Sequence, residues 1–313
     1  MESRSATWST GGAATDRSRG RPTAVNVLSI QSSVVYGRVG NRAAVLSLER
    51  LGHDVWPVDT VAFSNHPAHG AFRGRIIPAA EVRELVEGLA ARGVLERCDA
   101  VLSGYLGDPA TGSVVEDAVA RVRAANPRAL YCCDPVIGEV GRGAYVRAGI
   151  PETFRDRLVP LADIVTPNPF ELELLSGIAP VDLPAARDAA RVLLGRGPAL
   201  VVATGLQLRE APGQLAVLAA TRDEAWLVRH PRRVVRVWGT GDAFAALFLG
   251  AYLPRRDARA ALEHAVAALD GVLAVAERTD ADELPLVAAQ DALVHPRTRF
   301  GAEAVWGPER HLK

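Results

Sequence analysis

The most informative stretch of the sequence is Trp238-Gly239-Thr240-Gly241-Asp242-Ala243-Phe244. Two glycines flank a threonine, an aspartate follows, and the apolar run beyond it predicts a helix over 240–252. Glycine lets backbone N–H groups approach a ligand closely. The first turn of a helix adds free N–H donors and the positive end of the helix dipole. The residues Gly239, Thr240 and Gly241 therefore predict a phosphate-binding turn.

Asp242 adds a second function to this turn. A carboxylate does not bind phosphate, but it can take a proton from an alcohol that is about to attack one. An anion cradle next to a carboxylate base indicates a phosphoryl transferase. The alternative is that Asp242 only caps the helix, and the heptapeptide by itself leaves both interpretations open.

Composition limits the classes of protein that remain. The chain has 313 residues, of which 49% are apolar and 23% charged, and its formal net charge is zero. These values are ordinary for a folded globular protein and imply no bulk attraction to nucleic acid or to a membrane. The three cysteines (Cys98, Cys132 and Cys133) lack a zinc-type spacing. We therefore expect reduced, buried thiols in a cytoplasmic protein.

The chain divides into three parts. Residues 1–23 are rich in Ser, Thr, Gly and Arg and predict a disordered leader or a misassigned start. Residues 24–295 show no linker or repeat and predict one domain. Residues 296–313 predict a loose polar tail.

Strands and helices alternate on both sides of the phosphate turn. The pattern predicts strands at 24–31, 53–58, 99–102, 129–133, 164–165 and 199–203, with an antiparallel pair at 214–220 and 224–229. It predicts helices at 42–51, 79–92, 111–125, 151–161, 171–175, 184–195, 240–252, 257–276 and 286–294. Such alternation is typical of an α/β fold with a mostly parallel central sheet and helices on both faces.

Candidate binding residues follow the predicted strands. In open α/β sheets, ligands bind beyond the carboxyl ends of the strands. The residues at these ends are Ser32, Tyr105, Asp134, Thr166, Asn168, Thr204 and Gly205. We therefore expect one cavity to hold these residues together with Asp242.

A kinase also needs a divalent ion, which water and a few carboxylates usually hold. Asp134 and Glu171 are the candidate metal ligands. An ordinary strand-end turn at Asp134 and a first-turn helix charge at Glu171 are the alternatives. His66 and His69 lack a third ligand nearby in the sequence, which favours a loop role over a metal site.

The combination of motifs resembles the pyridoxal kinases of bacteria, within the ribokinase-like superfamily. The similarity lies in Ile30 to Gly37, in Phe63-Ser64-Asn65-His66, in Ser103 to Gly107, in Cys133-Asp134-Pro135, and in Asn168 with Glu171. Val287 to Asp291 extends the match, which covers about residues 24 to 295.

This resemblance implies a three-layer ribokinase-like fold and ATP-dependent phosphorylation of the 5′-hydroxymethyl group of pyridoxal. It implies that Asp242 is the base and that Gly239 to Gly241 form the anion hole. Ser32, Pro67 and Tyr105 would contact the pyridine ring. The nucleotide side would comprise Asp134, Thr166, Asn168, Glu171, Thr204 and Gly205. The family further implies Mg²⁺ near Asp134 and Glu171, admits a monovalent cation such as K⁺, and is usually homodimeric.

The sequence departs from the family pattern at several places, including Ser33, where histidine is frequent, and the segment between Trp226 and Gly239, which is shorter than expected. Pro67 stands where a polar residue is common, and it has neither a hydroxyl nor an N–H to offer a substrate. Thr204 stands where some relatives have lysine. A hydroxymethylpyrimidine or sugar kinase of the same fold is therefore an alternative, and a non-catalytic carrier of pyridoxal phosphate is another.

Overall fold

A ten-stranded sheet forms the middle layer of the protein, in the order β12-β11-β10-β9-β8-β5-β4-β1-β2-β3. The computed structural model describes residues 25–307. The strands from β9 across to β2 are parallel, and the strands at both edges are antiparallel. The sheet strands are β1 (Asn26–Tyr36), β2 (Asp54–Asn65), β3 (Gly74–Ile76), β4 (Ala100–Ser103), β5 (Leu130–Cys133), β8 (Ile164–Val165), β9 (Leu200–Leu206), β10 (Gln214–Ala220), β11 (Ala225–Pro231) and β12 (Glu303–Trp306).

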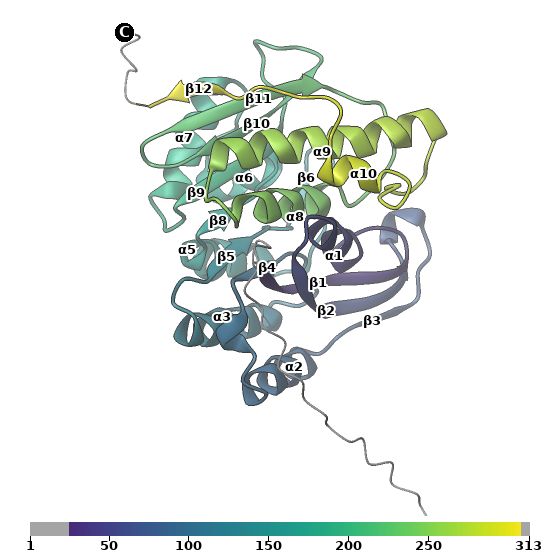
Figure 1. Ribbon diagram of the computed structural model, residues 1–313, viewed down its shortest axis with the longest axis vertical. Coiled ribbons are helices and arrows are strands. Elements are labelled where there is room, and N and C mark those ends of the chain that lie inside the picture. The colour runs from purple at the N-terminus through teal and green to yellow at the C-terminus, as the bar shows by residue number, and fades with distance from the viewer. Residues whose placement is uncertain (1–24, 308–313) are drawn as a thin grey trace, which may run out of the picture.

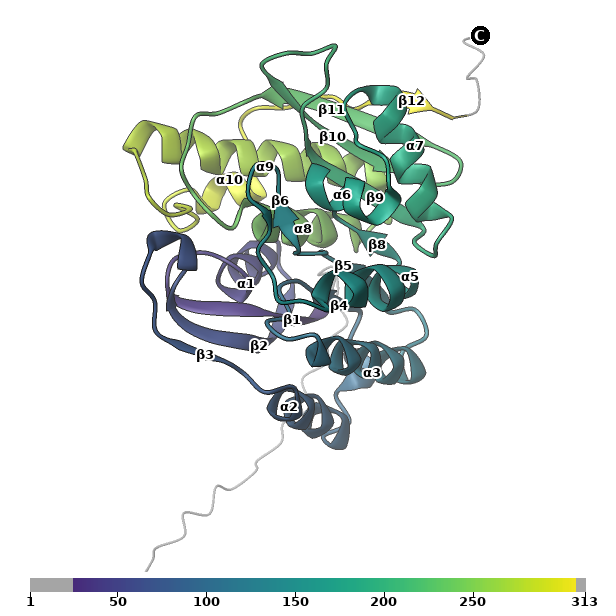
Figure 2. The ribbon, with the colours of Figure 1, turned by 180° about the vertical axis from the view of Figure 1, so that it is seen from behind.

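Helices cover both faces of this sheet. Figure 1 looks onto the face that is covered by α1 (Asn41–Arg50), α8 (Thr240–Tyr252), α9 (Ala258–Thr279) and α10 (Gln290–Val294). Figure 2 looks onto the opposite face. That face is covered by α2 (Ala79–Ala91), α3 (Ala110–Ala125), α4 (Ile150–Thr153), the π-helical turn η3 (Phe154–Leu158), α5 (Val159–Leu161), α6 (Pro169–Ser176) and α7 (Leu183–Leu194). The predicted three-layer α/β fold is confirmed.

Side-chain alternation along the strands builds two separate cores. Leu28 and Ile30 of β1 pack into the core of one face, whereas Val27 packs into the core of the other. Cys132 and Cys133 likewise enter opposite cores, and both thiols are free and buried. Strands that are buried on both sides are what a parallel sheet between two helix layers requires. Because both faces of these strands are buried, polar side chains lie mainly at the strand ends.

Several predicted boundaries differ from those of the structure. Strand β1 continues through Ser32 and Ser33, which were expected in a loop, since β1 pairs with β2 as far as Tyr36 and Asn65. The predicted helix over 286–294 is helical only in α10. The glycine-containing segment after Asp134 forms a small hairpin of β6 (Gly138–Glu139) and β7 (Gly143–Ala144). Two 3₁₀ turns, η1 (Pro67–His69) and η2 (Leu95–Arg97), complete the elements.

The expectation of a loose tail is wrong for the segment that forms β12. This strand pairs with β11 and extends the sheet at its edge. The predicted leader, residues 1–23, and the last residues of the tail, 308–313, lie outside the described part of the chain. Among the described residues, no helix is both long and apolar enough to cross a bilayer.

Candidate active site

A cavity of about 630 Å³ opens at the carboxyl ends of the parallel strands. The structure places every sequence-predicted site residue on its wall. These residues come from seven separate parts of the fold and are Ser32, Pro67, Tyr105, Asp134, Thr166, Asn168, Glu171, Thr204, Gly205, Gly239, Thr240, Gly241 and Asp242. Their convergence confirms the expectation of a single cavity, while the role of each residue stays a prediction.

The phosphate turn has the geometry of an anion site. Gly239 is the N-cap of α8 and has φ +84°, and a Cβ there would lie 2.0 Å from the carbonyl oxygen of Arg38. Only glycine fits this position without strain. Apart from its chain neighbours and the nearby backbone of α8, no described atom lies within 4 Å of the place that a Cβ on Gly241 would take. The first turn of α8, whose N–H groups have no partner within the helix, therefore lines the cavity and leaves room beside Gly241 for an anion.

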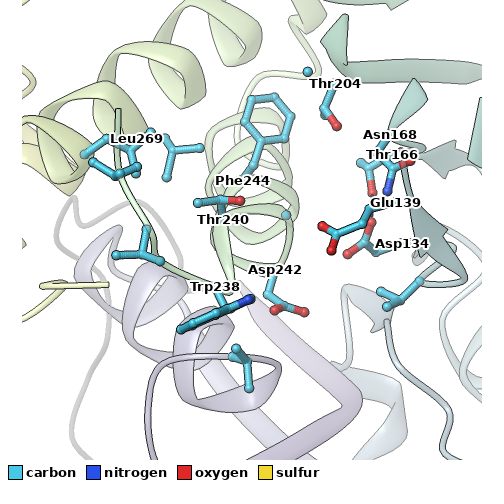
Figure 3. A pocket seen from close by; sticks show the side chains of 18 of the residues that line it. Asp134, Glu139, Thr166, Asn168, Thr204, Trp238, Thr240, Asp242, Phe244 and Leu269 are labelled. Carbon is cyan, nitrogen blue, oxygen red and sulfur yellow. Dashed lines mark hydrogen bonds between the residues drawn. The ribbon is translucent and has the colours of Figure 1, made fainter. Parts of the chain in front are cut away.

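Asp242 occupies the third position of α8, because Gly239 is the cap. Asp242 is therefore not the N-cap residue of α8, while its role as the base stays a prediction. Burial raises the pKa of Asp242 above its ordinary value, and hydrogen bonding from the backbone N–H groups of Gly40 and Asp242 itself opposes this rise. A carboxylate with a raised pKa is a better proton acceptor than one in water. Figure 3 shows the carboxyl group of Asp242 pointing into the cavity towards Asp134.

Asp134 lies across the cavity from α8. It is 5% exposed, and its Oδ1 accepts a hydrogen bond of 2.7 Å from the hydroxyl of Thr166. Burial, with a contribution from the negative charge of Asp242, raises the pKa of Asp134 to about 7. Asp134 is buried and Asp242 raises its pKa through its negative charge, so a cation between the two carboxylates would stabilise both. The donors therefore fit a divalent ion at Asp134.

Glu171 has a structural task in addition to any metal contact. Its Oε1 accepts from the N–H of Ile137 at 2.9 Å, and its Oε2 accepts from the N–H of Asn168 at 2.9 Å. Asn168 in turn accepts from the N–H of Glu171 at 3.0 Å, which completes a capping box at the start of α6. Burial raises the pKa of Glu171 well above its ordinary value. The pair ties α6 to the segment that leads into the β6–β7 hairpin.

The described residues contain no cluster of three His, Cys, Asp or Glu side chains that could hold a metal by itself. Mg²⁺ in phosphoryl-transfer enzymes is commonly held by one or two carboxylates, water and the substrate phosphates. The cavity fits that arrangement better than an all-protein cage.

Glu139 is a cavity residue that the sequence analysis missed. It lies in β6, and in Figure 3 its carboxyl group is next to that of Asp134. The side chain also forms an ion pair of 3.0 Å with Arg142. The sequence analysis assigned no role to the segment between Asp134 and Pro151 and therefore none to Glu139. Its position between Gly138 and Gly141 was the available signal.

One end of the cavity has walls suited to a flat ring. Ser32, Tyr105 and Pro67 lie there with the apolar side chains of Val34, Val61 and Phe63. Ser32 is 8% exposed. The carbonyl of Tyr105 accepts a 2.6 Å hydrogen bond from Thr60, and burial raises the pKa of the Tyr105 phenol.

Trp238 closes this end beside the phosphate turn. The ring of His66 stacks on it with the centroids 5.5 Å apart, and burial lowers the pKa of His66 to about 4. His66 is therefore neutral near pH 7. The stack joins residues that are 172 positions apart in the sequence, which is why sequence patterns could not reveal it.

The other end combines polar strand ends with an apolar wall. Thr204 and Gly205 at β9 face side chains from β10, α8 and α9, namely Leu215, Val217, Phe244, Val266, Leu269 and Leu273. Arg233 lies in the segment before the phosphate turn and forms a bidentate ion pair with the buried Asp270 at 2.6 and 3.0 Å. It therefore fixes the segment before the phosphate turn onto α9.

Known proteins share this arrangement. Residues 78–285 match the family described as phosphomethylpyrimidine kinase. The pyridoxal kinase PdxY of Rubrobacter xylanophilus is 52% identical over 283 residues, which cover 90% of this chain and 98% of that protein. The chain belongs to the pyridoxal kinase family. The PdxY of Corynebacterium diphtheriae is 44% identical over 282 residues, covering 90% of this chain and 100% of that protein.

Solved structures agree with this family assignment. The pyridoxal kinase of Leishmania donovani in complex with ADP and pyridoxine superposes with a TM-score of 0.84 at 31% identity, covering 90% of this chain and 99% of that one. A complex of the same kinase with ADP and pyridoxamine has a TM-score of 0.83 at 32% identity, with the same coverage. The resemblance to pyridoxal kinases seen in the sequence motifs is confirmed.

Proposed function

We propose that this protein transfers the γ-phosphoryl group of ATP to the 5′-hydroxymethyl group of pyridoxal, giving pyridoxal 5′-phosphate and ADP. The observation that carries the proposal is the position of Asp242. It lies in the first turn of α8, between a flat-walled end and an apolar-walled end of one cavity, and desolvation raises the pKa of its carboxyl group. Relatives that align over nearly their whole length are pyridoxal kinases.

In this reaction the oxygen of the alcohol attacks the γ-phosphorus, and the bond to the bridging oxygen of ADP breaks. Asp242 takes the proton of the alcohol. The N–H groups of Thr240 and Gly241 stabilise the negative charge on the transferring phosphoryl group. Mg²⁺, held beside Asp134 with Glu171 and Glu139 nearby, would neutralise phosphate charge when bound.

The two ends of the cavity then divide the substrates. The pyridine ring would lie among Ser32, Pro67, Tyr105 and the His66–Trp238 stack. The adenine would lie against the apolar wall of β10, α8 and α9, with Thr166, Asn168, Thr204 and Gly205 lining the path of the phosphates. We further propose that a monovalent cation such as K⁺ binds beside the phosphates.

A substrate panel tests the activity. The purified protein with ATP and Mg²⁺ is offered pyridoxal, pyridoxine, pyridoxamine, hydroxymethylpyrimidine and ribose in separate assays of ADP release. We expect pyridoxal to have the highest kcat/KM. A higher value for hydroxymethylpyrimidine would favour the alternative that the phosphomethylpyrimidine kinase match suggests. Tight binding of pyridoxal phosphate without any ATP turnover would favour a carrier, but the carboxylate of Asp242 on the cavity wall argues against one.

The assembly and location are also part of the proposal. Val35 is 80% exposed and Phe72 is 44% exposed, and such apolar side chains support a homodimer. Light scattering of the purified protein would test it. The three buried free thiols support a cytoplasmic location.

A further inference from the structure

Glu283, which lies outside the cavity wall, joins three segments around the proposed reaction centre. It is in the connection between α9 and α10, and its side chain is only 13% exposed. Its Oε1 lies 2.5 Å from Nε2 of His69, and its Oε2 accepts a 3.0 Å hydrogen bond from the N–H of Arg38. The carbonyl of Arg38 is the atom against which Gly239 packs. One carboxylate therefore links the loop of residues 63–73 to the support of the phosphate turn.

His69 connects Glu283 to residues that line the cavity. It ends the 3₁₀ turn η1, whose first residue is Pro67. Its ring also meets Trp238 edge-on, with the centroids 4.6 Å apart, while His66 stacks on the same indole. His66, Pro67 and Trp238 all line the cavity, but His69 does not. Any effect of His69 on a substrate must therefore act through its neighbours.

We propose that the His69–Glu283 hydrogen bond is a positioning contact that holds the loop of residues 63–73 closed over the alcohol substrate and in register with the phosphate turn. The inference rests on the proposed function and deepens it. Pro67 offers the substrate no hydrogen-bond donor, so this end of the cavity depends more on the shape of the loop. The shape of this loop depends on contacts that restrain it. The contact of His69 with Glu283 restrains the turn η1.

The chain offers a matched control on the neighbouring residue. Asp282 accepts a 3.0 Å hydrogen bond from the hydroxyl of Tyr36, which joins the same connection to the end of β1. Tyr36 is 54% exposed, and neither residue lines the cavity. If activity only required that the connection between α9 and α10 be anchored, loss of the Asp282 contact would matter as much as loss of the Glu283 contact. If Glu283 positions the loop of residues 63–73, loss of the Asp282 contact would have little effect.

The experiment compares His69→Phe, Glu283→Ala, Glu283→Gln and Asp282→Asn with the unmodified enzyme. Phenylalanine keeps an aromatic ring against Trp238, whereas glutamine keeps a hydrogen-bonding group that can reach both His69 and Arg38. We expect His69→Phe and Glu283→Ala to raise the KM for pyridoxal about tenfold, the scale of one lost hydrogen bond, with the KM for ATP within about twofold. Glu283→Gln and Asp282→Asn should stay close to the unmodified enzyme. An unchanged KM for pyridoxal in His69→Phe, or equal changes for both substrates, would overturn the proposal.

Hydrogen exchange separates this inference from the proposed activity, since it needs no substrate. The amides of His69 and Gly70 donate within η1 to His66 and Pro67. We expect them to exchange faster in Glu283→Ala than in the unmodified protein, with no change in Asp282→Asn. Equal exchange in Glu283→Ala and the unmodified protein would overturn the positioning role even if the kinase activity is found. Faster exchange in a protein that does not phosphorylate pyridoxal would leave the restraint standing and reject the proposed function.

Discussion

Asp242 is the residue on which the proposed chemistry depends. Asp242→Asn keeps the size of the side chain but removes the proton acceptor, so kcat should fall by at least about 10²-fold, the usual scale for a catalytic base. Folding and ATP binding should persist, because Gly239 and not Asp242 caps α8. Steady-state kinetics and nucleotide titration would measure both. Near-normal turnover would remove the role of Asp242.

The buried ring of His66 makes the stability of the folded protein decrease as the pH falls. Burial lowers its pKa in the folded protein from 6.5 to about 4, so between these values the unfolded chain binds a proton that the folded chain does not. Its contribution to stability is therefore present above pH 6.5 and is lost as the pH falls towards 4.

The Tm of the unmodified protein and of His66→Gln, measured from pH 7.5 to pH 4, would test this. We expect the difference between the two curves to shrink as the pH falls, because glutamine does not titrate. Parallel curves would show that the ring of His66 is not held neutral. The comparison between variants is needed because burial also lowers the pKa of His53, His230 and His264.

At the scale of single residues, the sequence was enough to predict which side chains meet. Strand ends in a parallel sheet lie on one edge, so Ser32, Asp134 and Thr204 could be assigned to one cavity from their order alone. The sequence was not enough to predict which contacts these and neighbouring side chains make. The His66–Trp238 stack and the His69–Glu283 contact join distant segments, and their geometry follows from packing.

In the phosphate turn, Gly239 is needed for the backbone conformation and Gly241 for the space beside it. Gly239→Ala should lower both the Tm and the activity, because its φ is +84° and its Cβ would collide with the carbonyl of Arg38. Gly241→Ala should keep the Tm, since the added methyl group meets open space, but it should lower activity by filling the place proposed for phosphate. Thermal melts and kinetics would distinguish the pair. An equal loss of Tm in both would contradict this division.

Strand β12 is an element that the sequence analysis took for a loose tail. It pairs with β11, and the guanidinium groups of Arg187 and Arg191 lie over the ring of Trp306 at 5.4 and 4.7 Å. Removing residues 303–313 would expose the edge of β11, so we expect a lower Tm and more aggregation. The KM values should change little, because β12 does not line the cavity. An unchanged Tm would show that the strand adds nothing to stability.

Local patterns and strand pairing explain which elements were predictable. The bounds predicted for α8 and β10 match the structure, because the apolar pattern and flanking turn residues are local. The extension of β1 past Gln31, the β6–β7 hairpin and β12 were missed. Each depends on a partner strand, and short polar strands carry little apolar periodicity.

At the scale of the whole molecule, the two faces of the sheet supply different halves of the cavity. Helices α8 and α9 of one face carry the phosphate turn and part of the apolar wall, while α6 of the other face carries Glu171. The segment that enters the phosphate turn is fixed to α9 by Arg233 and Asp270, and the loop of residues 63–73 is fixed by Glu283. The proposed reaction therefore requires both layers to be assembled around the sheet.

The most direct measurement is the stoichiometry of product formation with ATP, Mg²⁺ and pyridoxal, followed as ADP release and as pyridoxal 5′-phosphate in the same sample. The account predicts one pyridoxal 5′-phosphate for each ADP with the unmodified enzyme, and a rate at least about 10²-fold lower with Asp242→Asn. ADP release without pyridoxal 5′-phosphate, or turnover of another alcohol while pyridoxal is left unphosphorylated, would contradict it.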